Sequence, residues 1–554
     1  MSVYGPRAGD TVVLGGTGLA LHIDDRVADT HDEFRVGFAK TGRDGIGLKA
    51  IPTTQSCDVV LSNAIVLDPI TGVRVASIGI KDGRISGVGK AGNPDTTNNI
   101  DVVVGSGTVV IDADGLIATP GGIDTHVHSL SPRVFDSLIS SGITTVIAQE
   151  TGPVWGVGIG SARMLRQAYR TMDNFAINIG LLGRGSTSHE AVTREAVEAH
   201  VCGFKVHEDT GTTLRTLDTA LRAADEADVQ VAVHTDSLNE SLSASDTIAV
   251  LDGRVIHAYH VEGCGGGHSP DVLSLAGHDN ILASSTNPTL PYGINAVDEH
   301  VDMIMLTHAM HADRESDVRI ARARVRSATM AAENRLHDLG VIPITSSDAQ
   351  GMGRAGETWW RTFALAAVMK GDDSPAEVSD NDNERILRYL AKITINPAIT
   401  HGISHELGRL AEGYIADIVL WQPERFAAKP QLILKSGFPV WGQTGDPNAS
   451  IDSAEPLIIA EQFGAYASGP SDLSYLLSNQ IAVAESAPGT ARRTLTVRGC
   501  RQVRNTDMVR HGLAGPVKVV AATSPMQQPR VTWRGEALTM APVTHTPLSR
   551  LHFW

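Results

Sequence analysis

Short apolar segments alternate with amphipathic helical ones over residues 119–410, and this alternation constrains the fold more than any other feature of the chain. Strand-like segments such as "ITTVIAQE", "FAINIGLLG", "VQVAVHTD" and "NILASSTN" are separated by helical patterns such as "HEAVTREAVEAH" and "LRTLDTALRAADEAD". Strands that alternate with helices form parallel sheets, because a parallel connection needs a crossover. Eight such strands predict an α/β fold with a (β/α)8 TIM barrel over residues 119–410.

The regions that flank the barrel have a different sequence pattern. Residues 1–118 contain β-branched runs broken by glycine, such as "CDVVLSNAIVLD" and "VASIGIKDGRISGVG", which predict an N-terminal β-domain. After residue 410, "LGRLAEGYIADIVLWQP" and "PQLILKSGFPVWGQ" return to short strands. We expect residues 411–460 to rejoin the N-terminal strands in one composite β-domain, followed by a mixed C-terminal segment at 461–554.

Charge and composition exclude several classes of partner. The formal net charge is −16, which argues against general affinity for nucleic acid or for an anionic membrane, since both favour a basic surface. No run of about 18 apolar residues appears, and the N-terminus lacks the pattern of a signal peptide. The four cysteines are scattered, which gives no disulfide framework. We therefore expect a cytoplasmic protein that acts on small molecules or binds other proteins.

Residues able to bind metal recur where the predicted barrel strands end. In "GGIDTHVHSL", His126 and His128 are two residues apart on one strand, so their side chains share a face. The C-terminal ends of barrel strands converge on one mouth, where active sites of this fold lie. Later strands bring the same kind of residue to that mouth: Lys205, His207, His234, His260 and Asp348.

This set of residues suggests the chemistry of the site. Imidazole nitrogens with one carboxylate suit a borderline divalent ion such as zinc or nickel. Lys205 does not fit as an ammonium, which has no lone pair and repels cations. It either reacts with carbon dioxide to form an anionic carbamate that bridges two metals, or pairs with Glu208 or Asp209. The residues alone leave both interpretations open.

Longer motifs extend this pattern over nearly the whole chain. They include "YGPRAGDTVVL", "GGIDTHVH", "GFKVHEDTGTT", "HVEGCGGGHSPD", "SSTNPTLPYGINAVDEHVDM" and "SSDAQGMGR". Together they resemble the urease α subunits, nickel-dependent members of the amidohydrolase superfamily. The resemblance implies two Ni²⁺ per chain and a carbamylated lysine, N6-carboxylysine, formed from CO2 at Lys205. One ion would be held by His126, His128, Lys205 and Asp348, and the other by Lys205, His234 and His260.

The resemblance also implies catalytic roles and partners. His207 matches the residue that hydrogen-bonds the substrate carbonyl, and His308 matches an acid or base on a mobile flap. Asp209 and Arg324 match the residues that orient that histidine. The implied reaction is hydrolysis of urea with water to ammonia and carbamate. The implied partners are urease β and γ subunits in an oligomer of heterotrimers, with nickel-loading accessory proteins.

The chain departs from the family pattern at several positions around the expected pocket. Thr307 and Ala309 replace a cysteine and a second histidine on the flap, and Thr210 replaces an aromatic residue. "AQETGP" replaces a glycine-rich turn and places Gln149 and Glu150 near the barrel mouth. These changes admit a second hypothesis, hydrolysis of another amide, ureido or amidine compound. A third, a catalytically silent assembly subunit, is disfavoured because all the metal ligands are present.

Overall fold

The computed structural model describes most of the chain. The described residues are 5–27, 34–37, 40–151, 158–207, 212–236, 243–265, 269–373, 381–443, 454–456, 469–485, 488–511, 515, 517–520 and 528–549. Glu208, Asp209 and Thr210 lie outside them, so the roles expected for these residues stay predictions.

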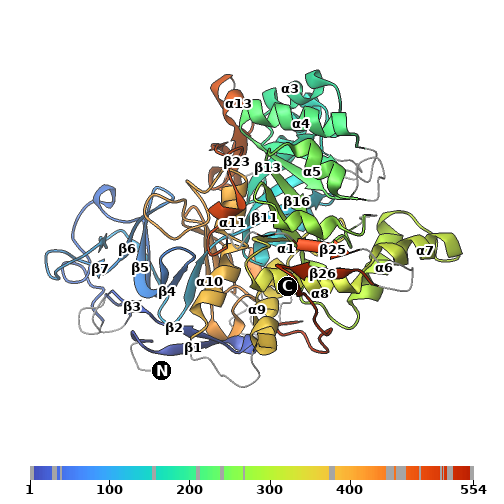
Figure 1. The fold of residues 1–554 in the computed structure, drawn as a ribbon. Helices are drawn as coiled ribbons and strands as arrows, with labels where there is room; N and C mark the ends of the chain where they lie inside the picture. Colours follow the sequence, from blue (N-terminus) through green and yellow to red (C-terminus); the bar gives the residue numbers. More distant parts are fainter. Residues whose placement is uncertain are drawn as a thin grey trace.

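Eight parallel strands form the centre of the molecule, and each pairs with the next along the chain (Figure 1). The last strand approaches the first where the N–H of His128 donates a 2.9 Å hydrogen bond to the Ala349 carbonyl. The predicted (β/α)8 barrel is thereby confirmed as a nearly closed ring. Its strands are β11 (Gly122–Ser129), β12 (Ile143–Thr151), β13 (Asn178–Arg184), β14 (Gly203–His207), β15 (Gln230–His234), β16 (Ile256–Tyr259), β17 (Ile281–Thr286) and β18 (Ile344–Ser346).

Helices follow the strands and cover the barrel. In α4 (Leu214–Ala227) the Thr213 side chain accepts a hydrogen bond from the Thr216 N–H, and the reverse bond completes a capping box. Leu217 and Leu221 lie buried one turn apart on its inner face. The other helices are α1 (Arg133–Ser140), α2 (Ala162–Thr171), α3 (Glu190–Glu198), α5 (Ser245–Leu251), α6 (Ala296–Thr307), α7 (Glu315–Arg324), α8 (Ser327–Asp338), α9 (Thr358–Asp373), α10 (Asn383–Ala391) and α11 (Ile395–Thr400).

A second sheet joins strands from before and after the barrel. Strand β10 (Ile117–Pro120) pairs in parallel with β4 (Val59–Asp68) and antiparallel with β19 (Ile418–Trp421). The Trp421 indole N–H donates to Thr119 Oγ1 at 2.9 Å across this seam. The composite β-domain expected from the sequence is present. Its other strands are β3 (Asp25–Arg26), β5 (Gly72–Lys81), β6 (Arg84–Gly89), β9 (Val109–Asp112), β20 (Leu432–Lys435), β21 (Phe438–Gln443) and β22 (Ala454–Pro456).

Smaller elements complete the chain. Strand β23 (Tyr475–Asn479) pairs in parallel with barrel strand β13 and with β24 (Arg493–Val497), so the C-terminal segment packs on the barrel. The described part of the chain contains no helix long and apolar enough to cross a membrane. The remaining elements are β1 (Thr11–Leu14), β2 (Leu19–His22), β7 (Ala91–Gly92), β8 (Val102–Val103), α12 (Gly469–Asp472), α13 (Gln480–Glu485), β25 (Val517–Val520), β26 (Arg530–Trp533) and β27 (Glu536–Ala537).

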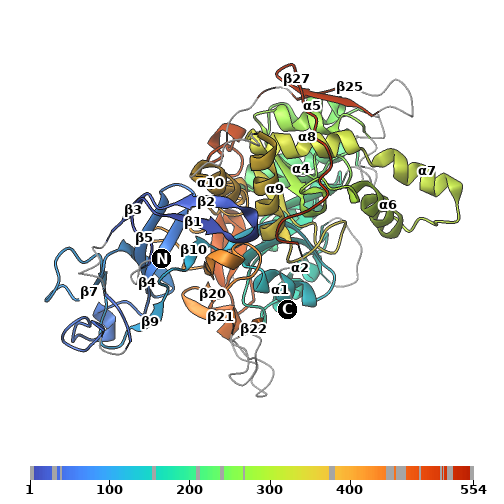
Figure 2. The same cartoon turned by 90° about the horizontal axis from the view of Figure 1, so that it is seen from below.

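The α6–α7 hairpin projects from the barrel at the end of the molecule opposite the composite β-domain, as both views show (Figures 1 and 2). Its apolar side chains form a cluster separate from the main core, in which Val301 and Ile304 pack with Ala321 and Val325. Leu306, near the end of α6, is 82% exposed. The same cluster also contains residues of the barrel loops and α8, namely Cys264, Tyr292, Met330, Ala331 and Met352. The hairpin therefore packs on the barrel through a small core separate from the main one.

Candidate metal centre and flap

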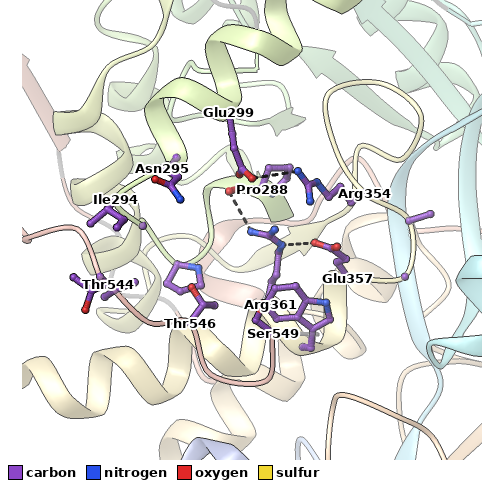
Figure 3. Close-up of a pocket in the computed structure, with 17 residues that line it drawn as sticks. Pro288, Ile294, Asn295, Glu299, Arg354, Glu357, Arg361, Thr544, Thr546 and Ser549 are labelled. Carbon is purple, nitrogen blue, oxygen red and sulfur yellow. Dashed lines mark hydrogen bonds and ion pairs between the residues drawn. The ribbon is translucent and has the colours of Figure 1, made fainter. Parts of the chain in front are cut away.

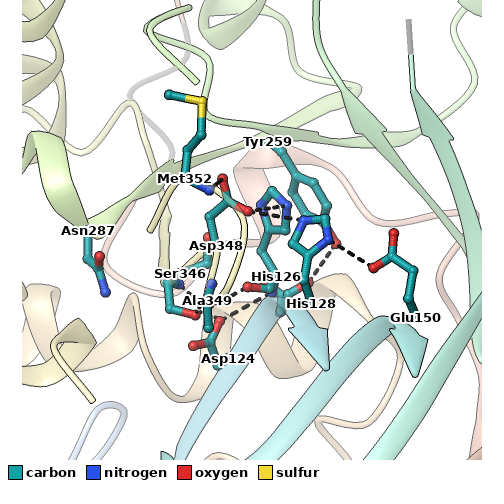
Figure 4. A network of polar contacts seen from close by, with 12 residues as sticks. Asp124, His126, His128, Glu150, Tyr259, Asn287, Ser346, Asp348, Ala349 and Met352 are labelled. Atoms are coloured by element: carbon teal, nitrogen blue, oxygen red, sulfur yellow. Dashed lines mark hydrogen bonds and ion pairs between the residues drawn. The ribbon is translucent and has the colours of Figure 1, made fainter. Parts of the chain in front are cut away.

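Three ligand atoms converge where β11 meets the loop after β18 (Figure 4). Asp348 Oδ1 lies 3.1 Å from His126 Nε2 and 3.2 Å from His128 Nε2. All three side chains are buried, and their ligand atoms lie within 4.8 Å of one another. Such a convergence of lone pairs at one point is the geometry of a metal site.

The backbone around this group is held by Asp124. Its Oδ1 accepts hydrogen bonds from the N–H groups of His126 at 3.2 Å and Ser347 at 3.0 Å, so one carboxylate joins the two segments that supply ligands. Gly351 leaves the space open, because a Cβ there would lie 2.4 Å from Asp348 Oδ1 and 2.9 Å from His128 Cδ2. The ligand positions are therefore set by the chain on both sides.

A second group of histidines lies beside the first. His234 is the last residue of β15, and His260 directly follows β16. Their ring centroids lie 4.4 Å apart, and the ring centroid of His260 lies 5.6 Å from that of His126. His207 stacks on His234 at 3.7 Å. Lys205 is buried among them, its Nζ 4.1 Å from the centre of the Tyr259 ring. The structure thus brings together the strand-end residues that the sequence analysis selected.

Buried polar atoms in this region lack hydrogen-bond partners within the described residues. They include Lys205 Nζ, His234 Nε2, both ring nitrogens of His260, and Asp348 Oδ1. A buried polar atom without a partner destabilises the fold by about 1–3 kcal/mol. Nitrogen and oxygen atoms left in this way fit the donor set of a divalent metal.

The ionisation of these groups follows their burial. Burial lowers the pKa of His126 and of His234 well below the ordinary value, and that of His260 to about 4. Burial also lowers the pKa of Lys205 to about 7, although Asp348 and Glu150 oppose the shift. Most of the site therefore holds neutral nitrogen bases near neutral pH, which are the forms that bind metal.

His128 differs from the other histidines. Burial opposes its charge, but the carboxylates of Glu150 and Asp348 raise the pKa of His128 to about 9. As a metal ligand its ring would keep a single proton, so an ion bound at this position would displace the other.

His308 lies at the end of α6, half-buried, and its ring is held by neighbours on both sides. Nδ1 lies 3.2 Å from the Ile304 carbonyl, which only accepts, and Arg324 Nη1 lies 3.2 Å from Nε2. Because a guanidinium only donates, these contacts assign the proton to Nδ1 and a lone pair to Nε2. Arg324 is itself buried, so it places a fixed positive charge next to the ring.

Two cavities of similar size have different surroundings. One of about 500 Å³ is bounded by Glu150, Arg184 and Ser186, and the Ser186 hydroxyl accepts a hydrogen bond from the His207 N–H. The other, of about 490 Å³, lies between the start of α6, α9 and residues 543–549 (Figure 3). Its arginines are paired: Arg354 with Glu299 and Arg361 with Glu357. The first cavity adjoins the candidate site, whereas the second is lined by satisfied charges.

Sequence reasoning did not select Tyr259, which contacts the site. Its ring stacks on His126 at 3.9 Å, and its hydroxyl donates to the Thr125 carbonyl at 2.5 Å. Its position directly before His260, at the end of a barrel strand, is the sequence feature that could have identified it. Gln149 and Glu150, expected near the mouth, are both buried, and Glu150 Oε2 lies 2.8 Å from His128 Nδ1.

Comparisons with known proteins agree with this geometry. Residues 1–111 match the urease alpha-subunit N-terminal domain, and residues 117–442 match the amidohydrolase family. Urease subunit alpha 2 of Streptomyces coelicolor is 52% identical, with 100% of this chain and 98% of that protein covered. Urease subunit alpha of Laribacter hongkongensis is 43% identical at the same coverages.

Solved structures show the same fold at low sequence identity. An L-hydantoinase (dihydropyrimidinase) from Arthrobacter aurescens has a TM-score of 0.50 and 16% identity, and the match covers 70% of this chain and 97% of that one. That likeness concerns the barrel architecture alone. Full-length similarity to the urease subunits decides the family: the chain belongs to the urease alpha-subunit family and is a hydrolase of the amidohydrolase type, which acts on carbon–nitrogen bonds.

Proposed function

We propose that the protein is the catalytic subunit of a urease and hydrolyses urea to ammonia and carbamate at a di-nickel centre bridged by carbamylated Lys205. The observation that supports this most directly is the convergence of buried, otherwise unpartnered ligand atoms from separate barrel strands. Because urease subunits align with the full chain, we take urea as the substrate and nickel as the metal.

The residues divide between two metal positions. His126, His128 and Asp348 would hold one ion, and His234 and His260 the other. The carbamate of Lys205 would join them. Nickel held by these residues would supply Lewis-acid polarisation of the urea carbonyl and activation of water as a nucleophile near neutral pH.

Lys205 is suited to form the bridge. Its pKa of about 7 leaves a large neutral fraction at physiological pH, and a neutral amine is the form that attacks carbon dioxide. The amine nitrogen forms a bond to carbon, one N–H proton is released, and an anionic carbamate results. Nζ has no hydrogen bond within the described residues. The competing salt bridge would use Glu208 or Asp209, which lie outside those residues.

The remaining side chains bind substrate and move protons. His207, stacked on His234, would donate a hydrogen bond to the urea oxygen, where negative charge grows during attack. His308 would serve as the acid or base at the leaving nitrogen, and its Nε2, which carries a lone pair here, would take up a proton before giving one. Arg324 would fix its ring orientation through the 3.2 Å contact with Nε2, and Asp209 would act with it. A flap at this position excludes water as it closes.

Subunit partners and location follow from the same assignment. We propose assembly with urease β and γ subunits into an oligomer of heterotrimers in the cytoplasm, with accessory proteins that load nickel. The exposed Leu306 on the hairpin is one apolar side chain that closure or assembly could cover.

Metal analysis and substrate screening test this function together. The protein, expressed with its β and γ subunits and activated with nickel and bicarbonate, should contain about two metal ions per chain and release ammonia from urea. One ion or none after activation would contradict the bridged pair. Two ions without urea hydrolysis would favour the second candidate, an amidohydrolase for another amide, ureido or amidine compound, which the buried Glu150 beside the site supports. The same ammonia assay over such compounds separates these outcomes.

A further inference from the structure

Glu150 lies next to a proposed metal ligand on the neighbouring strand. Strands β11 and β12 pair in parallel, with Val127 opposite Ala148 and Ser129 opposite Thr151, so Glu150 falls beside His128. The Glu150 side chain is buried, and its Oε2 lies 2.8 Å from His128 Nδ1. The register of the barrel therefore brings the carboxylate to this ring.

The two ring nitrogens of His128 face in different directions. Nε2 lies 3.2 Å from Asp348 Oδ1, whereas Nδ1 faces Glu150. Figure 4 shows Glu150 on the side of the His128 ring away from Asp348. A molecule at the metal position would meet the ring before it met Glu150. The carboxylate is thus placed to act on the ligand rather than on the substrate.

A histidine that binds metal through one nitrogen carries a proton on the other. An acceptor for that proton fixes the tautomer, holds the ring orientation and makes the ligand nitrogen more basic. A carboxylate is a strong acceptor for this purpose because the hydrogen bond is charge-assisted. Glu150 Oε2, 2.8 Å from His128 Nδ1, is close enough to serve as this acceptor.

The Glu150 backbone is held as well. The hydroxyl of Ser129, the residue after His128, donates a hydrogen bond to the Glu150 carbonyl. Two contacts therefore join this part of β11 to Glu150: one to its backbone carbonyl and one to its carboxylate.

We propose that Glu150 is a positioning residue, which accepts a hydrogen bond from His128 Nδ1–H and holds Nε2 toward the metal. This inference rests on the metal centre of the proposed function. Loss of such a partner commonly weakens metal affinity by about 10–100-fold. We expect Glu150 to set how long the ion at His126, His128 and Asp348 stays bound.

The test measures metal release from the activated enzyme to an excess of chelator. Glu150→Ala should release one ion about 10–100-fold faster than the wild type, while the second ion leaves at a rate closer to normal. Glu150→Gln should recover much of the retention, because its amide oxygen can accept the same hydrogen bond. Met164→Ala is the matched control: Met164 lines the same cavity and is 49% exposed, so this change alters the cavity and leaves the Glu150–His128 contact intact.

Each outcome decides between explanations. Equal release rates in Glu150→Ala and wild type would overturn the positioning role, as would equally fast release in Met164→Ala and Glu150→Ala. If Glu150→Ala does not fold, Glu150→Gln and Glu150→Leu decide instead: Gln keeps an oxygen that can accept from Nδ1–H and Leu does not. Leu should release the ion faster than Gln, and equal release from the two variants would overturn the proposal. A wild-type enzyme that binds no metal would instead contradict the proposed function itself.

Discussion

The barrel strand ends and the α6–α7 hairpin both supply residues to the proposed site, but they are built differently. His126, His128 and Asp348 are buried, and hydrogen bonds from the His126 and Ser347 N–H groups to Asp124 Oδ1 fix the chain that carries them. His308 is half-buried at the end of a projecting helix, beside an 82% exposed leucine (Figure 1). The proposed metal ligands lie in or directly after barrel strands, and the proposed acid or base lies at the end of a peripheral helix.

This difference separates two kinds of defect. A change at the strand ends should alter metal binding, because the ligand atoms have few other partners there. A change at the end of the hairpin helix should leave the metal in place and slow turnover, because none of the proposed metal ligands lies on the hairpin.

The largest effect is expected at Lys205. If its carbamate bridges the metals, Lys205→Ala should lose bound metal. Its activity should fall by at least about 10⁴-fold, since enzymes typically accelerate reactions by about 10⁶-fold or more. Formate added with nickel should restore part of the activity, because a small carboxylate can fill the vacant space and bridge the ions. Activity and metal content with and without formate are the measurements.

Lys205→Arg provides the contrast to that variant. A permanently charged guanidinium fills the space and repels cations, so formate should not restore activity. If Lys205 only pairs with Glu208 or Asp209, arginine becomes the milder change and alanine does not respond to formate. Higher activity in Lys205→Arg than in Lys205→Ala would contradict the proposed difference between the two regions, because the strand ends would then hold no lysine carbamate between two metals.

An intermediate effect is expected on the hairpin. His308→Ala should lower kcat by roughly 10²–10⁴-fold, the range for loss of a general acid or base, while metal content stays at the wild-type value. His311→Ala is the matched control, because His311 is an exposed histidine three residues further along the same hairpin. A loss of metal in His308→Ala would contradict the division between the two regions. Equal kcat in the two variants would remove His308 from the mechanism.

Much of this organisation could be predicted from the sequence, and the reason is periodicity. Each strand-end residue follows an apolar run, so residues such as His234 and Asp348 could be assigned to one mouth once eight strands were counted. The same logic predicted the return of the post-barrel strands, since "IADIVLW" reads as a strand with no partner nearby in sequence. The pairing of β19 with β10 supplies that partner.

Contacts across strands could not be predicted in this way. The Glu150–His128 contact depends on the register between β11 and β12, and a one-residue slip would turn Glu150 to the other face. The tautomer of His308 depends on Arg324, which is sixteen residues away on another helix. Local patterns fix which residues share a face, whereas packing fixes which atoms meet.

The smallest effect is expected from thiol-directed reagents. Thr307 stands on the hairpin where the family pattern has cysteine, and all four cysteines of the chain are buried. Burial raises the pKa of Cys264, which packs in the hairpin cluster, to about 12, so little reactive thiolate forms near neutral pH. Incubation of the activated enzyme with an alkylating reagent should therefore leave activity nearly unchanged. Thr307→Cys should be inactivated much faster, and substrate should slow that inactivation. Rapid inactivation of the wild type that substrate prevents would contradict this prediction. It would show that one of the four native cysteines becomes accessible near the site.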